Sequence, residues 1–130
     1  MKAGLVAAIV SGAPSTVHAL ATGRDPLEAT RAAGTLVLGD DAPPWALVLA
    51  AAPTHLAISL FWAAVLERVL PPRKRVAWGA AAGLAIAALD LGVVGRRFPA
   101  IRRLPLVPQL ADHAVFGAVV ALSGRGRSGS

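Results

Sequence analysis

Five side chains within apolar stretches of the chain are of types that do chemistry: His18, His55, Asp90, Asp112 and His113. Imidazole titrates near neutral pH and is a common metal ligand, and a carboxylate pairs with an imidazole or with a cation. None of them shows a ligand spacing on a single helix, such as His-x-x-x-His or Glu-x-x-His. They form a site only if the fold brings separate segments together.

Several other kinds of catalytic chemistry are missing from the sequence. The chain contains no Cys and no Tyr, so it has no thiolate nucleophile, and acid–base catalysis would fall to His, Asp, Glu or an Arg-assisted water. It has no P-loop, dinucleotide-binding fingerprint, Gly-x-Ser-x-Gly elbow or zinc-finger spacing. The sequence therefore favours a non-enzymatic protein.

The chain that must position these groups is short and apolar. It has 130 residues, of which 55% are hydrophobic and 15% charged, and its mean hydropathy is +0.62. Four apolar runs each have the ~20 residues that a helix needs to cross a ~30 Å hydrocarbon core. They cover residues 3–21, 45–66, 76–94 and 104–122. We expect an all-α integral membrane four-helix bundle, a single domain over 1–123, with a disordered tail over 124–130.

Two connections between the spans are expected to lie along the membrane surface. The sequence Asp-Pro-Leu-Glu at 25–28 predicts a helix start with Asp25 as its N-cap, and the helix runs to about Leu38. Because it is too short to span, we expect it as an interfacial helix between the first and second spans. Residues 98–108, which carry Arg102 and Arg103, form a second interfacial stretch.

The first apolar run also fits a secretory signal peptide. Lys2 would be its basic start, and Ala19-Leu20-Ala21 fits an A-x-A cleavage site. Such triplets arise easily in an Ala-rich chain, so both interpretations stay open. Cleavage would leave three spans and remove His18.

Basic residues border the apolar runs on both sides of the membrane. With four spans, both termini lie on one side, called side A here, and the two interfacial stretches lie on the other, called side B. Side A carries seven Lys and Arg and side B six, which favours cytoplasmic termini by one residue. The net charge is +6, but few aromatic residues lie among the basic clusters. We expect a multi-pass protein of the cell membrane whose partners are membrane lipids and not nucleic acid; a homo-oligomer or a larger membrane complex stays open.

Chain position gives each polar group a depth, at about 1.5 Å per helical residue. His18 and Asp90 lie roughly 6 and 7 Å inside the side B ends of their spans, and His113 and His55 lie roughly 13 and 15 Å inside. These groups therefore fall in the side B half of the bundle. We predict a ligand-binding pocket that opens on side B. Its lining is His18, His55, Asp90, Asp112 and His113, and its mouth is Arg24, Arg96 and Arg97, which suit a phosphate or carboxylate.

A structural interpretation stands beside each of these assignments. His18 and His55 could donate hydrogen bonds to carbonyls of neighbouring helices, and Asp90 could pair with a nearby His or Arg. Asp112 could cap the start of the fourth helix, and the Arg pairs could anchor headgroups. Two functional alternatives also stay open. One is an oligomeric transporter or lipid-modifying protein that acts on an anionic substrate through a His/Asp proton relay. The other is a metal- or haem-binding bundle, for which three His and two carboxylates would supply the ligands.

Overall fold

The fold is all-α over residues 1–124, the part of the chain that the computed structural model describes. No strand occurs within this range. The predicted disorder of the C-terminal tail falls, apart from Gly124, outside the described residues. The α-helices are α1 (Lys2–Val10), α2 (Ala13–Thr22), α3 (Glu28–Leu38), α4 (Pro44–Val69), α5 (Arg75–Leu89), α6 (Pro99–Arg102) and α7 (Leu106–Ser123). A π-helical turn, η1 (Asp90–Val94), and a 3₁₀ turn, η2 (Gly95–Arg97), continue α5.

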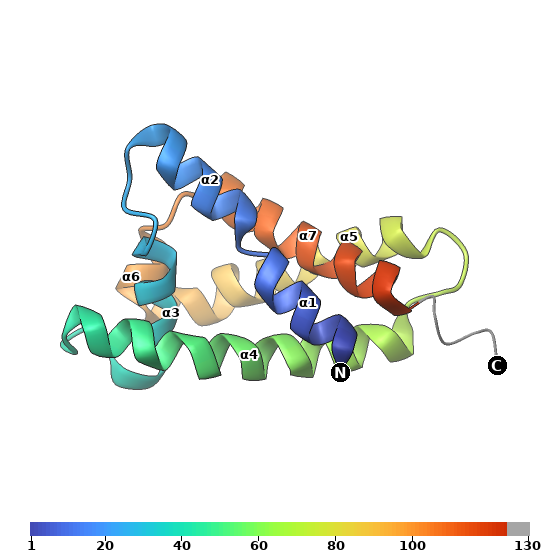
Figure 1. The fold of residues 1–130 in the computed structure, drawn as a ribbon, viewed down its shortest axis with the longest axis horizontal. Coiled ribbons are helices and arrows are strands. Elements are labelled where there is room, and N and C mark those ends of the chain that lie inside the picture. Colours follow the sequence, from blue (N-terminus) through green and yellow to red (C-terminus); the bar gives the residue numbers. More distant parts are fainter. Residues whose placement is uncertain (125–130) are drawn as a thin grey trace.

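Within residues 1–124, four helical stretches are long and apolar enough to cross a membrane, so the protein is a multi-pass membrane protein. They are Lys2–Thr22, Pro44–Val69, Arg75–Arg97 and Leu106–Ser123. In Figure 1 they run lengthwise through the molecule, with the α4–α5 turn and the end of α7 toward the right and with α3 and α6 at the left. The right end is side A and the left end is side B.

The distribution of side chains by size is that of a protein packed for a lipid environment. Large apolar residues cover the outside: Ile9 on α1 is 80% exposed and Phe61 on α4 is 60% exposed. The inside is built largely from alanine, and Ala7 and Ala87 are completely buried. Lipid tails solvate large apolar side chains as well as a protein core does, whereas small residues let helices approach closely. The exposed apolar surface is therefore the lipid-facing surface of the bundle.

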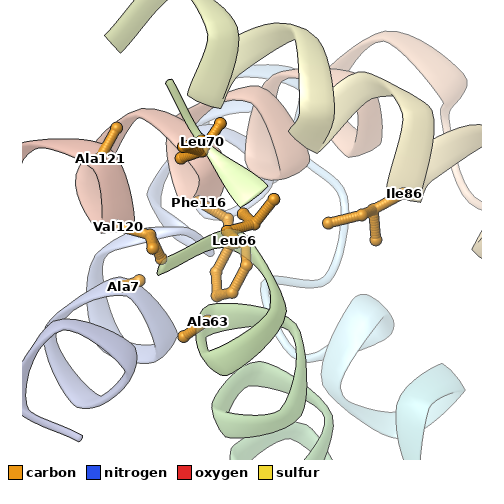
Figure 2. Close-up of a cluster of buried hydrophobic side chains, with 8 residues drawn as sticks. All are labelled: Ala7, Ala63, Leu66, Leu70, Ile86, Phe116, Val120 and Ala121. Carbon is orange, nitrogen blue, oxygen red and sulfur yellow. The ribbon is translucent and has the colours of Figure 1, made fainter. Parts of the chain in front are cut away.

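The larger apolar side chains inside the bundle gather in the side A half. Figure 2 shows this cluster, to which α1, α4, α5 and α7 all contribute and in which Leu66 and Phe116 lie at the centre. Its members are Ala7, Ala63, Leu66, Leu70, Ile86, Phe116, Val120 and Ala121. No ionisable group belongs to this cluster, so the chemistry-bearing groups of the spans lie elsewhere.

Glycines allow α5 and α7 to cross at backbone contact. A Cβ atom on Gly83 would collide with the carbonyl oxygen of His113, and one on Gly117 would collide with the carbonyl oxygen of Gly79. Gly79 and Gly83 form a G-x-x-x-G pair, the spacing that places two glycines on one helix face in membrane proteins. The crossing brings His113 on α7 against the side B part of the third span.

The first span, predicted over 3–21, consists of two helices with a break between them near Pro14. The helix stops at Val10 and restarts at Ala13, because Pro14 has no N–H to continue the hydrogen-bond ladder. Pro53, by contrast, lies inside the continuous helix α4. Beyond the break, α2 stays against α7 while it diverges from α4 (Figure 1). The break exposes the N-terminal amides of α2 within the bundle.

The interfacial helix α3 begins later than predicted. Its N-cap position is Leu27, so Asp25 is not the N-cap. Instead, the Asp25 carboxylate accepts the Leu27 N–H at 2.8 Å and pairs with Arg31 at 2.5 Å. These two contacts, the Leu27 hydrogen bond foremost, hold the pKa of Asp25 below its usual value. The predicted end at Leu38 is confirmed. In the predicted interfacial stretch 98–108, α6 occupies Pro99–Arg102 and the fourth span already begins at Leu106.

Candidate functional site

The first polar contact within the spans joins Asp90 to His113. Asp90 opens the π-helical turn η1 at the side B end of α5, and its Oδ2 lies 3.4 Å from His113 Nε2. His113 Nδ1 lies 2.8 Å from the carbonyl oxygen of Gln109, one turn earlier on α7. A carbonyl only accepts, so Nδ1 carries a proton. Nε2 then either accepts a hydrogen bond from neutral Asp90 or donates one to the Asp90 carboxylate, and in both cases the pair has no net charge.

The second contact joins Asp112 to the break in the first span. Asp112 Oδ1 accepts the backbone N–H of Ser15 at 2.9 Å. Ser15 is the third residue of α2, and its amide is one of those that the helix itself leaves without a partner. The prediction that Asp112 caps its own helix is wrong, because α7 begins six residues earlier, at Leu106. Asp112 instead supplies the N-terminal cap of α2 from another helix, where the helix dipole favours negative charge.

The third contact ties α4 to α1. His55 Nε2 lies 2.9 Å from the carbonyl oxygen of Ala8, near the end of α1. The carbonyl accepts, so Nε2 is the protonated nitrogen in this contact. This is the hydrogen bond to a neighbouring helix that the structural interpretation of His55 predicted. His55 and Asp112 therefore hold the two sides of the same break, His55 from α4 and Asp112 from α7.

His18 lies apart from these contacts. It lines a small cavity between α2, the loop that leads to α3 and the start of α7. The cavity has a volume of about 20 Å³, which is space for one water-sized molecule. Gln109, which is 9% exposed, lines the same cavity. The cavity is too small for a phosphate-bearing ligand or a haem.

The three arginines predicted at the mouth of the pocket do not act together. Arg24 pairs with Glu28 at 2.7 Å, four residues along the chain. Arg96 and Arg97 are exposed on η2, at the end of the third span. The eight predicted site residues are thus divided among a polar network around the α1–α2 break, a small cavity and the surface of side B. Ligand binding by them stays a prediction.

A larger cavity lies on side B, between α3, α4 and α6. It has a volume of about 420 Å³. None of the eight predicted site residues lines it; its polar lining comes from Glu28, Arg31, Thr35, Asp40 and Arg103. From the sequence, Arg31 and Arg103 are recognisable only as part of the basic charge of side B. A sequence signal for the cavity is Thr35, a polar residue on the buried face of α3, where it is 2% exposed.

Within residues 1–124, no three His, Asp or Glu side chains lie close enough together to hold a metal ion. The three His and two Asp of the spans are used in different contacts, and so the metal-binding alternative has no ligand set in this part of the chain.

The fold and these contacts define a class: a small, all-α, multi-pass membrane protein whose helices are tied together by polar contacts between the spans. Comparison of the chain with models of protein families, with curated proteins and with solved structures gives no match.

Proposed function

We propose that this protein is a non-enzymatic accessory subunit or binding protein of the cell membrane, and that the ionisable groups in its spans hold the helices together. The observation that carries the proposal is the use of these groups. His55 bonds to a backbone carbonyl of α1, Asp112 bonds to a backbone amide of α2, and Asp90 pairs with His113. A catalytic group needs a substrate beside it, and the two cavities described above are not lined by any of these four side chains.

The proposal includes the orientation and the partners. The termini lie in the cytoplasm, on the side that carries seven basic residues against six. Protease accessibility of a C-terminal tag in spheroplasts checks this, since cleavage of the tag in sealed spheroplasts would place the termini outside. Side B, with its arginines, faces lipid headgroups or a partner chain.

Exchanging His55 for glutamine tests the structural role directly. The Gln side chain also carries an N–H that can donate to the Ala8 carbonyl, but it does not titrate. We expect His55→Gln to keep the thermal stability of the purified protein in detergent. His55→Leu should lose about 1 kcal/mol, the contribution of one hydrogen bond between membrane helices. Equal destabilisation by both substitutions would contradict a role limited to the hydrogen bond with Ala8, because the imidazole ring itself would then be required.

One arrangement favours the alternative of an oligomeric transporter with a proton relay. The side chains of Asp90 and His113 are in contact, and Asp112 is the residue before His113 in the chain. Asp90 also lies in a π-helical turn, and such turns are frequent at functional sites. A line of titratable groups between helices is the means by which membrane proteins pass protons.

Proton flux into proteoliposomes separates the two functions. In vesicles that contain a pH-sensitive dye and carry an imposed pH gradient, the wild-type protein should dissipate the gradient no faster than protein-free vesicles do. Under the transport alternative, the wild-type protein would dissipate the gradient faster, and Asp90→Asn would abolish the excess without loss of expression. Asp41→Asn, at an exposed loop position, is the matched control.

A further inference from the structure

The groove between α3, α4 and α6 lies at the membrane–water boundary of side B. Figure 1 shows α3 crossing the N-terminal end of α4, beside α6. The crossing is close, because a Cβ on Gly34 would collide with the backbone carbonyl of Leu47. Leu47 lines the groove and lies three residues, roughly 4.5 Å along the axis, inside the start of the second span. The groove is therefore at the depth of lipid headgroups.

The charges in the groove have both signs. Arg31 is already paired with Asp25, and Glu28 is paired with Arg24. Arg103 and Asp40 also line the groove, and over residues 1–124 neither of their side chains has a hydrogen bond or an ion pair. One unpaired cation and one unpaired anion in a single groove fit a ligand that carries both a negative and a positive group.

The size and the surroundings of the groove narrow the range of possible ligands further. A volume of about 420 Å³ lies within the ~300–1,000 Å³ range of small-molecule sites. The apolar lining includes Leu47 and Pro99. Exposed apolar side chains continue from the same elements, with Val37 on α3 and Trp45 on α4. Acyl chains require such a surface, and Trp is typical of the headgroup level.

We propose that this groove binds the headgroup of an amine-bearing phospholipid of the phosphatidylethanolamine type. Arg103 binds the phosphate, with Arg31 beside it, and Asp40 accepts hydrogen bonds from the ammonium group. A choline headgroup has no N–H to donate to Asp40, and a glycerol headgroup has no positive charge. This lipid site requires that the protein lie in a membrane, but it does not depend on the role proposed for the His and Asp residues of the spans. None of those residues belongs to it.

Native mass spectrometry of the full-length protein in detergent tests this site, with dioleoyl phosphatidylethanolamine, phosphatidylcholine and phosphatidylglycerol added at equal concentrations. We expect the protein to retain the ethanolamine lipid in preference to the other two. Arg103→Gln and Asp40→Asn should each lower its retention about tenfold, the loss expected for one charge-assisted contact. Their neighbours provide matched controls, since exposed Arg102 and Asp41 do not line the groove, and Arg102→Gln and Asp41→Asn should retain the lipid as the wild type does.

Four outcomes would overturn the proposal. Equal retention of the three lipids would show that there is no headgroup selection. An equal loss in the variants and in their neighbouring controls would show that only general surface charge matters. Displacement of the lipid by millimolar phosphoethanolamine would assign the groove to a soluble ligand. Because Arg103 and Asp40 are exposed, all four variants should keep the helical circular-dichroism spectrum and elution volume of the wild type. Loss of either property in Arg103→Gln or Asp40→Asn would also count against the proposal, because the groove charges would then support the fold. The His55 substitutions test the proposed function independently of all these outcomes.

Discussion

Replacing Gly117 by valine is expected to prevent stable assembly of the bundle. A Cβ at this position would collide with the carbonyl oxygen of Gly79 and lie 3.1 Å from the backbone nitrogen of Gly83. Backbone atoms cannot rotate away as a side chain can, so α5 and α7 would have to separate along their whole contact. We expect the loss in the free energy of unfolding to be about 3 kcal/mol or more, the upper end for overpacked sites. Size-exclusion chromatography and thermal unfolding in detergent would measure it.

A glycine in open space provides the control for this substitution. Gly92 has no atom within 4 Å of a Cβ built on it, so Gly92→Ala should be neutral or stabilise slightly, because alanine favours helix by up to about 1 kcal/mol. If Gly117→Val unfolded at the same temperature as the wild type, the two helices would not cross at this glycine. The position assigned to His113 against Asp90 would then be wrong as well.

Replacing Asp112 by alanine is expected to release α2 from α7. The Ser15 amide would lose its acceptor inside the bundle, and hydrogen bonds that involve a charged group contribute about 1.5–3 kcal/mol. Asp112→Asn should keep most of the stability, because the amide oxygen of Asn also accepts the Ser15 N–H. Thermal unfolding gives the size of the effect, and hydrogen exchange at the Ser15 amide shows where it acts. In both variants, hydrogen exchange of the residues around the α4–α5 turn should be the same as in the wild type.

The comparison of the two Asp112 variants separates a structural carboxylate from a functional one. If Asp112→Asn were as destabilised as Asp112→Ala, the negative charge itself would be required at the start of α2, through the helix dipole. If Asp112→Asn were stable but changed proton flux in vesicles, the relay alternative would replace the proposed function. Asp41→Ala, at an exposed loop position, controls for the general loss of one negative charge.

The fold class could be predicted from the sequence because a bilayer constrains it strongly. Every spanning segment must satisfy its backbone internally and must be about as long as the membrane is thick. The apolar runs therefore gave the four spans to within a few residues, and Gly79 and Gly83 marked a face of close approach. The helix ends were predicted less accurately than the spans. Asp25, for example, accepts the Leu27 N–H but is not the N-cap of α3.

The candidate site was predictable only in part, because chain position gives the depth of a residue and not the direction of its side chain. Depth alone placed His18, Asp90 and His113 in the side B half. Which of them meet depends on the rotation of each helix and on the crossing of α5 and α7 at their glycines. That crossing pairs Asp90 with His113 and leaves His18 in a separate cavity.

The sequence by itself thus determined that the chain is a bundle of membrane-spanning helices with its ionisable groups toward one side, because hydrophobicity and length are properties of each segment alone. Only the tertiary structure decided that Asp112 caps α2, that His55 bonds to α1, and that α3 and α6 enclose a charged groove against α4. Contacts between helices depend on how their surfaces fit together, and a fit between two surfaces is not encoded in either segment separately.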